Sequence, residues 1–133
     1  MKAIFVAAAL ATVLVAPPSS AADAPPSQGA KRTVLSRTDV PNSNYEVVMV
    51  LIEVPANTQV GRHTHPGKVA GYVVDGTYTI VIDGQPPRAL KANDSLEIPI
   101  GAIHDEFTTD QPAKLIGVFT VEKGKPLATP VTP

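Results

Sequence analysis

The amino-acid sequence predicts a single all-β domain, built as a β-sandwich or a barrel. Turn-forming residues recur about every eight to twelve positions, and short segments rich in β-branched residues lie between them. After the apolar N-terminal segment, no stretch shows the 3.6-residue period of an amphipathic helix. A chain of 133 residues is long enough for one hydrophobic core and too short for two. Many short strands separated by glycine and proline are typical of sandwiches and barrels.

The N-terminal segment, residues 1–22, predicts a signal peptide. Lys2 supplies a short positive region, residues 3–15 are apolar, and small residues up to Ala22 suit a signal peptidase. The alternative is an uncleaved membrane anchor, but the apolar run is too short for a transmembrane helix. We therefore expect cleavage after Ala22, a periplasmic or secreted location, and no membrane contact after cleavage.

The rest of the chain divides into a body with a short extension at each end. Residues 23–40 are expected to form a flexible, Pro-rich leader followed by a first edge segment. Residues 41–122 carry the regular β pattern and are expected to form the barrel. Residues 123–133 form a Pro-rich tail, of which Leu127 and Val131 are candidates for docking onto the body.

The strands of the body can be placed from their composition. Residues 45–54 are apolar on both faces and predict a buried strand. Residues 69–74 and 77–82 flank Asp75-Gly76, a dipeptide that predicts a tight turn and hence a hairpin. Further short strands are expected at residues 88–91, 95–98, 102–108 and 113–121. The prolines of the body fall at the ends of these strands, where a missing amide hydrogen costs least.

Composition excludes several classes of function. The formal net charge is −1 and aromatic residues make up 5% of the chain, so neither nucleic acid nor an anionic membrane surface is an expected partner. The chain has no cysteine, which excludes thiolate catalysis, disulfides and thiolate metal sites. Any metal ion must therefore be held by imidazole and oxygen ligands.

The three histidines of the chain are the main indication of function. His63 and His65 are two positions apart, so on a strand both side chains point to the same face. His104 lies on a later strand, which in a closed barrel can run beside the first. Three such imidazoles can hold one divalent ion. The alternative is that each is a half-exposed packing residue, as a lone histidine in a β-protein usually is.

The segments around the histidines are GRHTHPG at residues 61–67 and PIGAIH at residues 99–104. They resemble the two motifs of the cupin family, His-x-His followed by Glu and Gly, and Pro-x-Gly-x-x-His. The matching residues are His63, His65 and Gly76 in the first motif and Pro99, Gly101 and His104 in the second. The resemblance extends over residues 45–121.

The resemblance implies an all-β, cupin-like double-stranded β-helix, a jelly-roll barrel in a single domain, with one metal ion inside. Members of the family carry iron, manganese, nickel, copper or zinc, and many are dimers, so a homodimer is expected here. The family includes dioxygenases, isomerases, lyases and decarboxylases as well as proteins that only bind or store. The fold therefore does not choose among chemistries.

The sequence departs from the first motif at Val69, where the family has its glutamate ligand. Smaller departures are Asn93 and Thr108, which stand where the second motif has Gly and Asn. Without that glutamate, three neutral imidazoles leave a bound divalent ion with one more unit of positive charge than the family's usual ligand set does. This extra charge disfavours ions that prefer oxygen ligands. The expected cofactor is thus one divalent transition metal, Fe, Zn, Ni or Cu. The same charge favours an anionic small-molecule ligand or substrate.

Glu106 is the candidate catalytic residue, because strand alternation points it the same way as His104. A buried carboxylate is costly unless it is paired or binds a metal. Three roles are open to Glu106: a replacement ligand, a partner that orients a histidine, or a general base. The alternative is a solvated carboxylate at the mouth of the barrel.

Other residues are weaker candidates. Gln59 is four residues before His63, so strand alternation would point it to the same face, and it is a candidate for substrate binding. Lys68 lies beside the first motif and is a second candidate, although surface lysines are usually solvated. Strand alternation points Tyr72 and Tyr78 to the face opposite the inward-pointing residues. They are therefore expected to face outward, where a second subunit can cover them.

Three functions remain open from the sequence. The first is a metal-dependent enzyme, a non-haem dioxygenase or isomerase acting on a small organic anion. The second is a non-catalytic cupin that binds a metal or a small molecule. The third is a degenerate, metal-free cupin in which Val69 marks a lost site.

Overall fold

A computed structural model describes residues 29–132 of the chain. The predicted signal peptide, its cleavage site and the first part of the predicted leader lie outside the described residues. Within the described part of the chain, no helix is long and apolar enough to cross a membrane. The strands of this part are β1 (Lys31–Asp39), β2 (Tyr45–Val54), β3 (His63–Thr64), β4 (Lys68–Ile82), β5 (Arg88–Lys91), β6 (Ser95–Ile98), β7 (His104–Phe107), β8 (Ala113–Glu122) and β9 (Thr129–Pro130).

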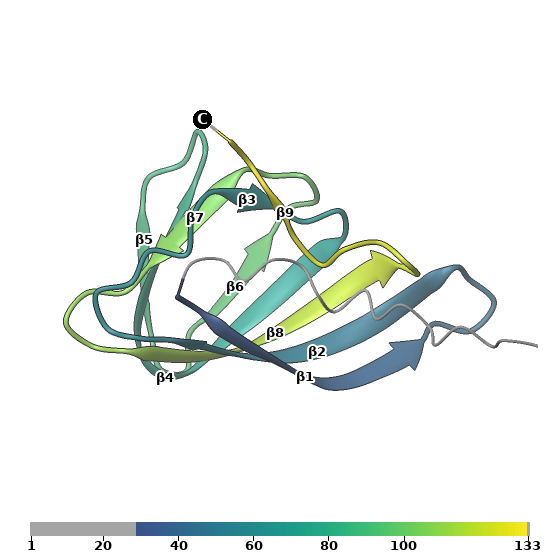
Figure 1. The fold of residues 1–133 in the computed structure, drawn as a ribbon, viewed down its shortest axis with the longest axis horizontal. Coiled ribbons are helices and arrows are strands. Elements are labelled where there is room, and N and C mark those ends of the chain that lie inside the picture. The colour runs from purple at the N-terminus through teal and green to yellow at the C-terminus, as the bar shows by residue number, and fades with distance from the viewer. Residues whose placement is uncertain (1–28, 133) are drawn as a thin grey trace, which may run out of the picture.

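The strands form two antiparallel sheets that share β4. The first half of β4 lies between β6 and β8, and β2 and β1 continue that sheet to its edge. The second half of β4 lies between β5 and β7, and β3 and β9 continue the other sheet. Figure 1 shows β1, β2 and β8 on one side of the molecule and β3, β7 and β9 on the other. The all-β jelly-roll fold predicted from the sequence is confirmed.

The hairpin predicted at Asp75-Gly76 is wrong, because β4 runs through this dipeptide without turning. The pairing of β4 with β8 shifts by one residue between Val73 and Asp75 and then continues to Gly76. Gly76 has a φ of 79°, so the positive φ expected for a turn occurs beside a β-bulge instead. This irregularity lies where β4 passes from one sheet to the other.

The same bulge reverses the side-chain alternation along β4. Val69 and Val73 point into the barrel before the bulge, whereas Tyr78 and Ile80 do so after it. The expectation that Tyr78 faces outward is therefore wrong, since its side chain is 6% exposed. Tyr72 precedes the bulge and is 45% exposed, as expected.

Gly76→Ala is expected to lower the free energy of unfolding by at least about 2 kcal/mol more than Gly84→Ala. A Cβ at Gly76 would overlap the carbonyl oxygen of Pro112, and this main-chain atom has little freedom to move. Gly84 has a similar φ of 78°, but a Cβ there would meet nothing within 4 Å. The pair of variants separates the overlap from the cost of a positive φ, about 1–2 kcal/mol. Urea unfolding measures both losses, and equal losses would contradict the prediction.

Candidate metal centre

The three histidines meet inside the barrel, as the sequence predicts. His63 begins β3, His104 begins β7, and the two residues are direct partners across the antiparallel pair. His65 follows β3 and points to the same side. Their exposed fractions are 4%, 0% and 4% for His63, His104 and His65. One nitrogen from each ring lies within 4.8 Å of the other two, close enough for a single ion to bind all three after a small adjustment.

Each imidazole is oriented by a hydrogen bond on its outer nitrogen. The Nδ1 atoms of His63, His65 and His104 contact the main-chain carbonyl oxygens of Gly61, Leu127 and Ala102 at 2.8, 2.6 and 2.9 Å. A carbonyl oxygen only accepts, so each Nδ1 carries the proton and each Nε2 presents a lone pair. The Nε2 of His104 is buried and has no hydrogen-bond partner among the described residues. Histidines that bind metal ions are commonly held in this way, so the site fits a divalent ion.

Glu106 places its carboxylate beside the histidines. Its Oε1 lies 3.5 Å from Nε2 of His104, and its Oε2 lies 3.7 Å from Nε2 of His63. These distances are long for hydrogen bonds, but two ligands of one ion are typically about 3–3.5 Å apart. Glu106 is 5% exposed, so it is not a solvated carboxylate at the barrel mouth. Val69 lines the same pocket from β4, at the position where the family has its carboxylate.

The pKa values in the cluster reflect burial and the single carboxylate. Burial lowers the pKa of His63 and lowers that of His65 to about 4. Burial also acts to lower the pKa of His104, but the interaction with Glu106 outweighs it and raises the value. For Glu106, burial acts to raise the pKa, but His104 and His63 outweigh it and lower the value. The carboxylate is therefore charged, and it faces two imidazoles across the centre.

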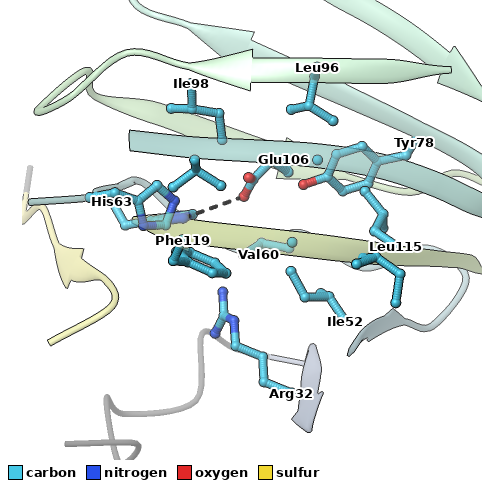
Figure 2. Close-up of a pocket in the computed structure, with 15 residues that line it drawn as sticks. Arg32, Ile52, Val60, His63, Tyr78, Leu96, Ile98, Glu106, Leu115 and Phe119 are labelled. Atoms are coloured by element: carbon cyan, nitrogen blue, oxygen red, sulfur yellow. Dashed lines mark ion pairs between the residues drawn. The ribbon is translucent and has the colours of Figure 1, made fainter. Parts of the chain in front are cut away.

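A largely apolar pocket adjoins this cluster (Figure 2). Its cavity volume is about 30 Å³, which is room for about two water molecules. The apolar residues that line it include Ile52, Val60, Leu96, Ile98, Leu115 and Phe119. Sequence reasoning missed two polar residues of the pocket, Tyr78 and Arg32. Tyr78 was missed because the bulge reverses the side-chain alternation that was used to predict its direction. Arg32 was missed because no local sequence pattern indicates that its segment pairs with β2.

Tyr78 and Glu106 face each other across the pocket (Figure 2). Burial raises the pKa of Tyr78 well above its ordinary value, and the charge of Glu106 raises it further. The phenol therefore keeps its proton and can donate a hydrogen bond to the carboxylate. Tyr78 can thus hold Glu106 in place.

The structure places the other two candidates, Gln59 and Lys68, outside this pocket. The exposed side chain of Gln59 donates a hydrogen bond to Asp105 at 2.6 Å. Gly61, with a φ of 95°, breaks the alternation between Gln59 and His63, so that Val60 points inward instead. Lys68 is exposed and forms an ion pair with Glu97 at 2.6 Å. Their positions do not support contact with a substrate in the pocket.

The tail contributes to the site through its main chain. Leu127 supplies the carbonyl that binds His65, and β9 pairs with β3 beside His63. Deleting residues 123–133 is therefore expected to weaken zinc binding about tenfold, because His65 loses the bond that orients it. Leu127→Ala keeps the carbonyl and serves as the control. Competition with a chromogenic chelator measures both affinities, and unchanged binding by the truncated protein would contradict the prediction.

Comparisons with known proteins agree with this architecture. The DMSP lyase DddQ from Ruegeria pomeroyi is similar with a TM-score of 0.68 and 19% identity, covering 79% of this chain and 53% of that one. The chain therefore spans about half the length of that lyase. The polyketide cyclase RemF from Streptomyces resistomycificus is similar with a TM-score of 0.65 and 22% identity, and the match covers 82% of this chain and 75% of that one. A cupin-like protein from Thermotoga maritima has a TM-score of 0.60 and 24% identity, covering 77% and 75%.

No curated protein matches the sequence. The model of the cupin domain matches residues 50–121, which is more than half of the chain. This segment contains all three histidines and both motifs. The chain belongs to the cupin family.

Proposed function

We propose that this cupin holds one divalent transition metal ion with His63, His65 and His104, and that it is a metal-dependent enzyme for a small organic anion. The observation that carries the proposal is the orientation of the three imidazoles, each with Nδ1 bound to a carbonyl and Nε2 free to bind an ion. A buried Nε2 without a partner, as in His104, is costly in a site that binds nothing. This cost argues against a degenerate, metal-free barrel.

The reaction classes that suit the pocket are those of a dioxygenase or an isomerase. A bound divalent ion would supply Lewis acidity, and iron would also supply redox chemistry. Glu106 is placed to bind the ion as a fourth ligand or to take a proton from a substrate beside the histidines. Tyr78 is placed to donate a hydrogen bond to this carboxylate, and the apolar wall keeps bulk water from the reacting groups.

The first experiment measures metal content. Protein purified without a histidine tag is expected to contain about one equivalent of metal, and its thermal midpoint is expected to rise when Zn, Fe, Ni or Cu is added. A metal-free protein whose midpoint ignores all four ions would support the degenerate cupin and overturn the proposal.

The second experiment separates an enzyme from a binding protein. Iron-loaded protein is tested for oxygen uptake with the smallest 1,3-diketones and with short carboxylic acids, and nuclear magnetic resonance of the same mixtures detects isomerised products. Turnover with any of these supports the enzyme. Saturable binding without turnover favours the non-catalytic cupin, which the small cavity also suits.

We further propose that the protein is exported and forms a homodimer. Export is supported by the signal-like segment of residues 1–22. The homodimer is supported by Met49, Tyr72 and Val74, which are 39%, 45% and 43% exposed on the first sheet. N-terminal sequencing of periplasmic protein tests the cleavage after Ala22. Light scattering of wild type and Tyr72→Glu tests the dimer, and a monomeric wild type would contradict it.

A further inference from the structure

Asp105 lies between His104 and Glu106 on β7. The side chains of these two neighbours are buried and point into the barrel, whereas the half-buried Asp105 points to the opposite face of the strand. On that face, Oδ1 of Asp105 accepts a hydrogen bond from the main-chain N–H of Gly61 at 2.9 Å. Its Oδ2 accepts a second hydrogen bond, from the side-chain amide of Gln59, at 2.6 Å. One side chain of β7 therefore holds the loop that leads into β3.

Gly61 connects Asp105 to the imidazole of His63. Its N–H donates to Asp105, and its carbonyl oxygen accepts the hydrogen bond from Nδ1 of His63 at 2.8 Å. β3 is only two residues long, and its pairing with β7 consists of His63 opposite His104. So short a ladder gives the preceding loop little support. The contact with Asp105 therefore fixes the group that orients His63.

We propose that Asp105 is a positioning residue of the metal centre: it holds the main chain of Gly61, which in turn sets the tautomer and the direction of the His63 imidazole. This inference rests on the proposed function and adds a residue to the same site. Groups that bind the outer nitrogen of a metal-binding histidine typically change metal affinity about ten- to a hundredfold when they are removed. Asp105 acts through one intervening residue, so its effect is expected at the lower end of this range.

The first test measures the imidazole tautomers in metal-free, full-length protein. Nitrogen-15 nuclear magnetic resonance, at a mildly alkaline pH that keeps the imidazoles uncharged, distinguishes a ring protonated at Nδ1 from one protonated at Nε2. All three rings of the wild type are expected to carry the proton on Nδ1. In Asp105→Ala, His63 is expected to populate the Nε2-protonated form, because the carbonyl of Gly61 is no longer held. His65 and His104 bind other carbonyls and are the internal controls.

The second test measures zinc affinity by competition with a chromogenic chelator. Asp105→Ala is expected to bind zinc about tenfold more weakly than the wild type. Asp105→Asn keeps an oxygen that can accept the N–H of Gly61, so it is expected to recover most of this loss. Asp83→Ala is the matched control, because it removes an exposed carboxylate that binds the side chain of Arg62, at 3.0 and 2.7 Å, and is expected to bind zinc like the wild type.

Circular dichroism and the thermal midpoint check the fold of each variant. Asp105→Leu has nearly the size of the native side chain without an acceptor oxygen, and it takes the place of Asp105→Ala if that variant does not fold. An unchanged His63 tautomer in the folded variant overturns the role of Asp105, and so does an equal change at all three rings. Wild-type zinc affinity of the same variant also overturns it.

These outcomes leave the three-histidine site standing and are therefore distinct from a failure of the proposed function. A wild-type protein that binds no zinc overturns the proposed function. In that case the tautomers of the metal-free protein still decide whether Asp105 orients His63.

Discussion

His104→Ala is expected to weaken zinc binding about a thousandfold. His104 is fully buried, its Nδ1 is fixed by Ala102, and its Nε2 has no other partner among the described residues. The chain has no fourth histidine that could replace it, and the pocket keeps only two imidazoles in the variant. Competition with a chromogenic chelator of known affinity measures the loss.

Thr64→Ala is the control for this prediction. Thr64 lies between His63 and His65 on β3, but alternation turns its side chain away from the centre. It is expected to bind zinc like the wild type. Because His104→Ala also leaves a cavity, His104→Gln provides a second variant of similar size, and circular dichroism checks both folds. If either variant folds and keeps wild-type affinity, the three-histidine site is wrong.

Glu106→Gln is expected to weaken zinc binding about a hundredfold. The carboxylate lies 3.5 and 3.7 Å from two of the Nε2 atoms and is the buried anion that faces them. The amide keeps the size of the side chain but removes the charge, so it is a poorer ligand for a divalent ion. A variant with full zinc affinity would rule out the ligand role and leave Glu106 as a base or as a partner that orients His104.

The double variant Val69→Glu, Glu106→Gln tests whether Glu106 on β7 replaces the glutamate that the cupin motif has on β4. Val69 is 4% exposed, lines the same pocket, and stands where the cupin motif has its glutamate. Moving the carboxylate back to β4 is expected to restore most of the affinity lost in Glu106→Gln. Val69→Gln, Glu106→Gln is the matched control, because it adds the same bulk without the charge. Equal affinities of the two double variants would contradict the proposed exchange.

Much of the fold follows from local sequence patterns. The strand bounds of β2, β5 and β6 agree with those predicted. Short apolar or β-branched runs between turn-forming residues favour the extended conformation of a strand. The convergence of the histidines was also predictable. Alternation sets His63 and His65 on one face, and the two cupin motifs imply that His104 lies beside them.

Other features depended on contacts between distant parts of the chain, which local patterns do not contain. Asp75-Gly76 has the composition of a turn, but pairing with β8 holds it in a continuous strand and thereby turns Tyr78 inward. Arg32 reaches the pocket only because β1 pairs with β2, and the acceptor for His65 comes from Leu127, 62 residues away. Such contacts form when the sheets close. The sequence alone therefore determined most of the strands and the three histidines that could hold a metal ion, whereas the tertiary structure decided which other groups surround them.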